Sequence, residues 1–310
     1  MIPIGFFFIG FGILLIILQK YVNEMCIKKY VDTYLWAKII FSLFALSVII
    51  SSINNLFSQN LLIFPIGMMY LAFTFVILHS SIKLGNKNTV IFFTLSLIIG
   101  FFSEFLGIKY GLVFGNYYYN IPAFFFETVP LMTPISWAII IYMCYGLTNF
   151  ILFYSGGNKP NFRGNLAYFI LITIVLAAID GLCAMNLDMI MDPVAVLPSI
   201  ASWLWIGGGP YFNVPISNFI GWFMVTFVVT VIFRFYEPFT KKNKTQENLN
   251  LLFFMPILYF LYFLDQATLA FNHGKNFEII LIGVAVMFPF LLISLLLFLN
   301  KKYWGNYENK

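Results

Sequence analysis

The sequence predicts an all-α integral membrane protein, a polytopic helical bundle of about nine transmembrane helices that forms one domain over residues 1–310. Hydrophobic residues make up 61% of the chain and charged residues only 9%, far more apolar surface than a soluble domain of this length can bury. The apolar residues also fall into separate stretches, each close to the ~20 residues that cross a hydrocarbon core. The stretches leave no room for a separate soluble domain.

The expected spans follow one another along the whole chain. The first one lacks the cationic start of a cleavable signal peptide, so we interpret it as a retained helix. The spans are expected near residues 2–19, 36–57, 61–82, 88–106, 131–154, 164–184, 216–236, 249–271 and 278–299.

The positive charges predict the orientation. When the loops are assigned alternately to the two sides, all but two of the 17 Lys and Arg residues fall on one side, and Lys109 and Lys275 fall on the other. Cytoplasmic loops carry such an excess, so we expect the N-terminus outside, the C-terminus in the cytoplasm and the chain in the cell membrane. The net charge of +5 reflects this bias. Because the basic residues are scattered, it does not indicate nucleic-acid binding.

No metal site is expected. Cys26, Cys144 and Cys183 have no neighbours at the spacing of metal ligands, and we interpret them as small apolar residues. His79 and His273 are too isolated to form a ligand pair.

Two loops on the outer side are long, over residues 107–130 and 185–215. Both are rich in Gly, Pro and aromatic residues and nearly free of Lys and Arg. Long ordered loops are usually functional, and these are too apolar to be solvated linkers. We expect them to fold onto the outer mouth of the bundle, with 194–206 a candidate for a short interfacial or re-entrant helix carrying Trp203 and Trp205.

Acidic residues inside the spans are costly and are therefore candidates for function. Glu104, Asp180 and Asp265 each lie about 24 Å along a hydrocarbon core ~30 Å thick, counted from its inner face. All three are therefore expected in the outer third of the membrane. The alternatives are that Glu104 or Asp180 reaches the aqueous interface, and that Asp265 only bonds a neighbouring helix.

The outer loop and the seventh span add polar residues at the same level. Asn218 and Trp222 are four residues apart and share a helix face, and Asp192 precedes Pro193 nearby. The structural alternatives are a helix cap for Asn218, a turn for Asp192 and an aromatic belt for the tryptophans. Asp188 is interpreted as a solvated loop residue, although a helical conformation would place it on the face of Asp192.

The expected site contains acids and aromatic residues but almost no basic residues, and this restricts the reactions that it can catalyse. Lys109 and Lys275 are the only basic residues expected on this side, which argues against a diphosphate substrate, because phosphates need Lys, Arg or Mg²⁺. A carboxyl group among apolar walls keeps its proton at neutral pH and can protonate an alkene. Aromatic faces stabilise the resulting carbocation. Attack by water gives hydration, and attack by an internal alkene gives cyclisation.

Several motifs between about residues 100 and 235 are similar to motifs of a known protein family. The stretch 104–119 looks like an E…G…G-x-P-F-G-x-Y-x-Y segment, with Val113 in place of Pro. The other matches are Val129-Pro130-Leu131 to Ser136-Trp137, Asp180, Met191-Asp192-Pro193, Trp203-x-Trp205 and Tyr211 to Trp222, in which Phe212-Asn213 stands for Tyr-Gly. These segments resemble the CruF-type carotenoid 1,2-hydratases, a family that includes bisanhydrobacterioruberin hydratase. For the second Asp of the D-x-x-x-D-P region of that family, Asp188 is the candidate in this sequence.

The resemblance implies a membrane enzyme that hydrates the C1–C2 double bond of acyclic carotenoid ends without a cofactor. Glu104 and Asp180 are our candidates for the proton donor and the partner that tunes it, and Asp192 and Asn218 for positioning water. The expected substrate-binding wall comprises Tyr117, Trp137, Trp203, Trp205, Tyr211 and Trp222. The polyene substrate would enter laterally from the membrane lipids.

Two alternatives remain open from the sequence. A carotenoid or terpenoid cyclase would use the same protonation chemistry. A proton-coupled transporter or lipid-binding protein would use Glu104, Asp180 and Asp265 as a relay. The expectation that the polar residues stop at one leaflet, and the lack of a convincing inverted repeat, favour the enzyme.

Overall fold

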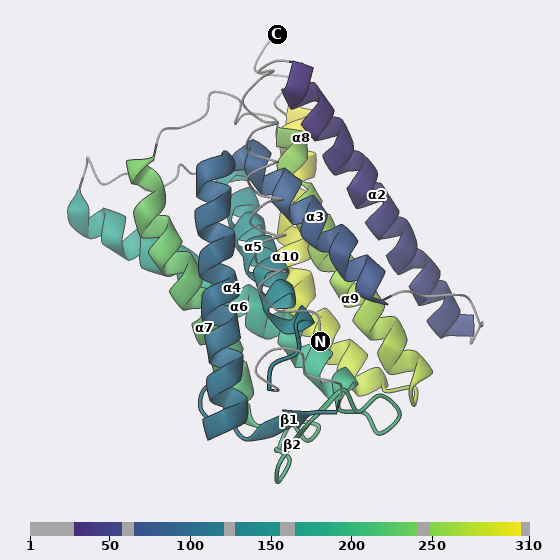
Figure 1. Ribbon diagram of the computed structural model, residues 1–310. Coiled ribbons are helices and arrows are strands. Elements are labelled where there is room, and N and C mark those ends of the chain that lie inside the picture. Colours follow the sequence, from purple (N-terminus) through teal and green to yellow (C-terminus); the bar gives the residue numbers. More distant parts are fainter. Residues whose placement is uncertain (1–27, 58–64, 121–127, 156–164, 241–248, 305–310) are drawn as a thin grey trace, which may run out of the picture.

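The computed structural model describes residues 28–57, 65–120, 128–155, 165–240 and 249–304 (Figure 1). The expected span at 2–19 lies outside these residues. The elements are α2 (Lys28–Phe57), α3 (Pro65–Lys83), α4 (Asn86–Tyr110), β1 (Tyr117–Tyr119), α5 (Met132–Tyr154), α6 (Leu166–Ala195), β2 (Trp203–Trp205), α7 (Ile216–Tyr236), the 3₁₀ turn η1 (Glu237–Phe239), α8 (Leu249–Leu252), α9 (Phe254–Asn272) and α10 (Phe277–Trp304).

Eight of the helices in the described ranges are long and apolar enough to cross a membrane. They correspond to the second to ninth spans expected from the sequence, and the all-α, multi-pass membrane class is confirmed. The helices run side by side as one bundle (Figure 1).

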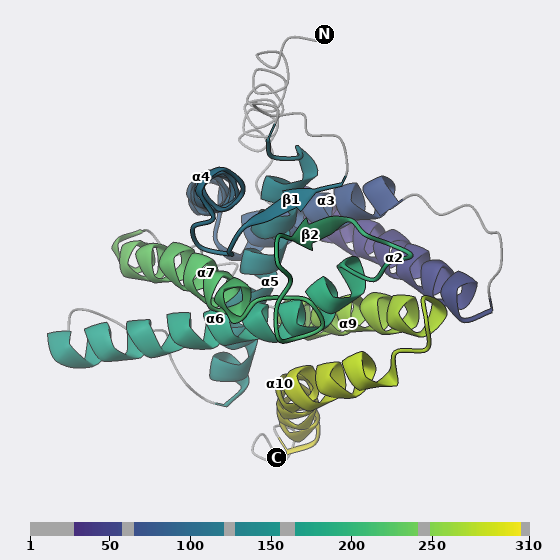
Figure 2. The ribbon, with the colours of Figure 1, turned by 90° about the horizontal axis from the view of Figure 1, so that it is seen from below.

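Helix α5 lies at the centre of the bundle (Figure 2). It packs against α3, α4, α6, α7, α9 and α10, and 83% of its span is buried, against 22% for α10. A helix enclosed on all sides must be apolar all round, which explains why the sequence of α5 has no polar stripe. Elements that meet α5 at its ends can therefore place side chains over the core of the bundle.

Helix α6 is longer than expected. It does not end near residue 184 but continues through Pro193 to Ala195. A proline inside a helix has no N–H for the carbonyl four residues earlier, here that of Met189. The Tyr211 hydroxyl donates to that carbonyl oxygen at 2.7 Å. This contact supplies the missing donor and allows the helix to run on.

Instead of the candidate helix at 194–206, the second long loop contains a β-strand. Strands β1 and β2 pair antiparallel, with Tyr117 opposite Trp205 and Tyr119 opposite Trp203. This two-stranded ribbon lies across one end of the bundle (Figure 1), which we call the ribbon end. Alternation along β1 turns Tyr118 outward, 47% exposed, and buries Tyr117. The described parts of the two loops, residues 107–120, 128–130 and 196–215, thus fold onto the bundle as expected.

The tight turns explain one of the departures from the CruF-type pattern. Phe212 and Asn213 have φ of 47° and 67° in a two-residue turn that Tyr211 and Val214 close as a bridge. Such a turn needs left-handed backbone, which Gly and Asn adopt most readily, so Asn213 is a suitable replacement for Gly. Val113, with φ of 70°, has a conformation that Pro cannot adopt. This turn therefore differs from one built with Pro.

Candidate active site

Glu104 of α4 is buried at the ribbon end, 6% exposed. Its Oε2 atom accepts hydrogen bonds from the hydroxyls of Tyr117 and of Tyr119, the latter at 3.0 Å, and its Oε1 atom accepts one from Trp137 Nε1 at 2.8 Å. Gly100, one turn earlier in α4, makes room for Trp137, because a Cβ atom there would lie 2.8 Å from the Cβ of Trp137. Strand β1 and helix α5 thus hold the Glu104 carboxylate from two sides.

The two phenols act as donors over the whole physiological pH range. Burial, and next the negative charge of Glu104, raise the pKa of Tyr117 and Tyr119 well above 10. The charge of Asp192 raises the pKa of both phenols further. Glu104 and Asp192 therefore act on the same two hydroxyls, although they belong to different helices.

A second acidic group lies on the adjacent helices. Asp188 and Asp192, one turn apart in α6, both accept from the amide of Asn218 in α7, with Asn218 Nδ2 2.6 Å from Asp188 Oδ2. Trp203 Nε1 of β2 donates to Asp192 Oδ1 at 3.2 Å. None of Asp188, Asp192 and Asn218 is more than 2% exposed. Their burial shows that Asp188 is not the solvated loop residue that we expected.

Aromatic rings connect the two acidic groups. The rings of Tyr119 and Trp203, which bond to Glu104 and Asp192 respectively, have centroids 5.8 Å apart. Behind them Tyr117 lies 5.7 Å from Trp205, whose Nε1 atom donates to the carbonyl of Phe114. The site is thus a set of acids enclosed by an aromatic wall from β1, β2, α5 and α7.

A family model described as "Carotenoid biosynthesis protein" matches residues 59–290. The chain belongs to this carotenoid biosynthesis protein family. No curated protein and no solved structure matches it. The matched range includes α4 to α7 and both strands, so every element that contributes to the site lies within the family region of this carotenoid biosynthesis protein.

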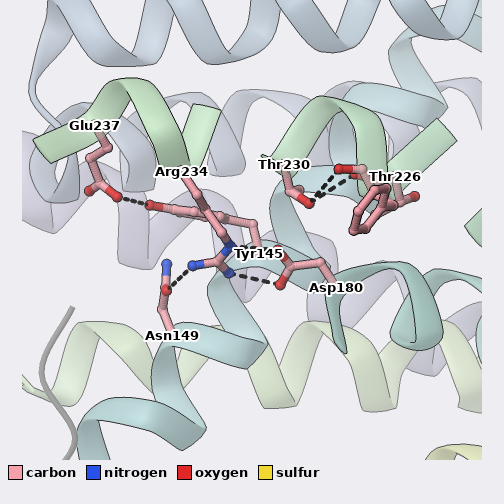
Figure 3. Close-up of polar contacts among 8 residues, drawn as sticks. Tyr145, Asn149, Asp180, Thr226, Thr230, Arg234 and Glu237 are labelled. Atoms are coloured by element: carbon pink, nitrogen blue, oxygen red, sulfur yellow. Dashed lines mark hydrogen bonds and ion pairs between the residues drawn. The ribbon is translucent and has the colours of Figure 1, made fainter. Parts of the chain in front are cut away.

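Asp180 is the one predicted site residue that this carotenoid biosynthesis protein places elsewhere. Its carboxylate is held by Arg234 in the last turn of α7, through Nε and Nη2 at 2.8 Å each, while Arg234 Nη1 donates to Asn149 at 2.9 Å. Figure 3 shows Arg234 between these two partners. Tyr145 lies beneath the guanidinium, at 4.4 Å, and donates to Glu237.

Asp180 does not lie at the level of Glu104, as the sequence led us to expect. Helix α6 has 30 residues, and Asp180 lies near the middle of this helix rather than at the ribbon end. Arg234 is 3% exposed, so it belongs to the core and not to a basic loop. As a result, the buried polar groups do not stop at the ribbon end, and that argument against a transporter fails.

The remaining polar residues lie apart from the site. Asp265 of α9 accepts from Ser51 of α2 at 3.3 Å, which is the helix-to-helix contact considered from the sequence. His79 contacts the Tyr142 hydroxyl at 2.7 Å and the Leu251 carbonyl at 3.0 Å. His273 contacts Ser199 at 2.9 Å.

Apart from Asp180, the predicted site residues all meet at the ribbon end. Tyr211 is there too, but its hydroxyl is engaged by the Met189 carbonyl, so it positions the turn of α6 that carries Asp188 and Asp192. Sequence reasoning missed Tyr119, and it named Asp188 only as a candidate for a motif position, without a role in the reaction. The signals were present: Tyr119 is two residues from Tyr117, as strand alternation requires, and Asp188 is four residues from Asp192, as a shared helix face requires.

Proposed function

We propose that this protein is a carotenoid hydratase that adds water across the C1–C2 double bond of an acyclic carotenoid end group, by acid catalysis and without a cofactor. One observation carries the proposal. In a protein of a carotenoid biosynthesis family, two groups of buried acids converge under an aromatic ribbon at one end of the bundle.

The aromatic wall of the site is suited to stabilising a carbocation intermediate. Protonation at C2 leaves a tertiary carbocation at C1, and each indole or phenol face stabilises a cation by ~0.5–2 kcal/mol. The rings of Trp137 and Trp222 have centroids 4.2 Å apart, and Trp137 is bonded to Glu104. Three donors stabilise negative charge on Glu104, which suits an anion that attracts the cation better than a proton donor. This role replaces the one that we inferred for Glu104 from the sequence.

Water is the second substrate. The Asp192 carboxylate and the Asn218 amide are bonded to each other, and a carboxylate beside an amide can accept from a water molecule and orient it. Attack of this water on C1 would give the tertiary alcohol. The pair keeps the role that it has in our interpretation of the sequence.

We expect the lipid-soluble polyene to arrive sideways from the outer leaflet. Apolar side chains at the ribbon end are well exposed, among them Leu112 at 54%, Ile216 at 54% and Ile206 at 70%. This surface suits the membrane interface better than open water.

The orientation is tested by thiol labelling in intact cells of a Cys26→Ser background. Ile206→Cys, at the ribbon end, is expected to react with a membrane-impermeant reagent added outside. Lys87→Cys, exposed at the opposite end of α4, is expected to react only after lysis. The reverse pattern would place the site at the inner leaflet and contradict the charge argument.

The aromatic wall is tested at Trp222. Trp222→Phe keeps a π face and is expected to retain part of the rate. Trp222→Leu keeps apolar bulk without the quadrupole and is expected to be slower than the wild type by about 5–30-fold, the equivalent of ~1–2 kcal/mol. The measurement is turnover per folded molecule. Equal rates for the two variants would mean that Trp222 serves only in packing.

The function itself is tested by expression in a host that makes lycopene, followed by pigment extraction and mass spectrometry. A hydratase adds the mass of one water for each end modified. A cyclase would change chromatographic retention without changing mass. Unchanged pigments in cells that contain the folded protein would favour a transport or lipid-binding role.

A further inference from the structure

The carboxyl groups of Asp188 and Asp192 both accept from the Nδ2 atom of Asn218, so one oxygen of each lies within hydrogen-bonding distance of the same nitrogen. Both are buried, at 0% and 2% exposure. Two carboxylates so close together repel each other, and burial makes each charge costly, so one of the two acids keeps its proton. The pair therefore holds one proton.

The donors around the pair indicate which acid carries it. In the described part of the chain, Asp192 accepts from two N–H groups, Trp203 Nε1 at Oδ1 and Asn218 Nδ2 at Oδ2. Asp188 accepts from Asn218 at Oδ2 only, and its buried Oδ1 atom has no hydrogen-bond partner within those same residues. N–H donors stabilise the charged form of a carboxyl group. The proton accordingly resides on Asp188 Oδ1.

Two other buried acids fit this role less well. Glu104 is supplied with donors on both oxygens, and Asp180 is held as the counter-ion of Arg234. The turn that carries Asp188 is held in place by the Tyr211 hydroxyl on the Met189 carbonyl. The acid that retains its own proton is thus also held in one orientation.

We propose that Asp188 is the general acid of this site and that Asp192 is the general base that takes the proton from water. The inference rests on the hydratase function proposed above. The Oδ1–H bond of Asp188 breaks as its proton forms a bond to C2 with the π electrons of the alkene, which leaves the cation at C1. A water oxygen bonds to C1, and one proton of that water passes to the Asp192 carboxylate and back into the pair. One water is added, and the pair holds one proton before and after.

The first test is infrared spectroscopy of the purified protein at neutral pH, because a protonated carboxyl group has a C=O stretching band separate from that of carboxylates. Asp188→Asn is expected to remove such a band, whereas Glu104→Gln is expected to keep it. An unchanged band in Asp188→Asn overturns the inference whatever the activity of the protein.

The second test is turnover per folded molecule. Asp188→Asn is expected to lose at least ~10²-fold, the lower range for general acid catalysis. The matched control Asp265→Asn, on α9, is expected to be near wild type. Loss of the band with normal turnover would overturn the catalytic role. If Asp188→Asn does not fold, Asp188→Glu is expected to shift the band and lose most of the rate, and an unshifted band would contradict the assignment.

The two tests also separate this inference from the proposed function. If the wild-type protein hydrates no carotenoid, the hydratase function fails and the role of general acid fails with it. The shared proton is judged by the infrared band alone, which needs no substrate.

Discussion

Asp180→Asn is expected to destabilise the protein by ~3–5 kcal/mol, the usual cost of removing one partner from a buried ion pair. The substitution leaves the Arg234 guanidinium, 3% exposed, without its bidentate counter-ion. Turnover per folded molecule is expected to stay within a few-fold of wild type, because Asp180 lies outside the ribbon-end cluster. Thermal unfolding in detergent, with turnover normalised to folded protein, measures both quantities.

A double variant provides the control for this prediction. Asp180→Leu with Arg234→Met removes both charges together, so it is expected to be more stable than Asp180→Asn alone. A stable Asp180→Asn variant that has lost at least ~10²-fold in rate would contradict this account and restore Asp180 as a catalytic residue.

Glu104→Gln is expected to lower turnover by at least ~10²-fold, as loss of a preorganised electrostatic group does. The neutral side chain no longer attracts the cation. In either orientation of the amide that Glu104→Gln introduces, its NH₂ group faces another hydrogen-bond donor. This donor is Trp137 Nε1 in one orientation and the tyrosine hydroxyls in the other. The unpaired donors are expected to cost a further ~1–3 kcal/mol of stability.

Tyr119→Phe is the matched control for Glu104. It removes one of the donors to Glu104 and keeps the ring against Trp203, so a smaller loss of rate is expected. Near-normal turnover of folded Glu104→Gln would show that the charge on Glu104 has no part in the reaction.

The membrane class and the convergence of the site follow from local rules. Every span must be apolar, and a helix rises by a fixed amount per residue. Glu104, Asp192, Asn218 and Trp222 could therefore be placed at one level before any contact was known. Trp203 and Trp205 could be added to this group because a long apolar loop is unfavourable in water and is expected to fold onto the bundle.

The errors come from contacts between distant parts of the chain. Pro193 normally predicts the end of a helix, and only the Tyr211 hydroxyl, from the following loop, reveals why α6 continues. Because the helix was expected to end early, Asp188 was interpreted as solvated. Arg234 lies at the end of the expected span 216–236 and was grouped with the basic residues of the loops, but its burial depends on Asp180, 54 residues away in the sequence.

Hydration is tested most directly with purified protein in lipid vesicles that contain an acyclic carotenoid, incubated in water enriched in ¹⁸O. The account predicts a product that carries one heavy oxygen for each end modified, formed by the wild type and lost in Glu104→Gln. A product of unchanged mass would identify a cyclase. The absence of any product from folded wild-type protein, with acyclic carotenoids of several chain lengths, would contradict the proposed function.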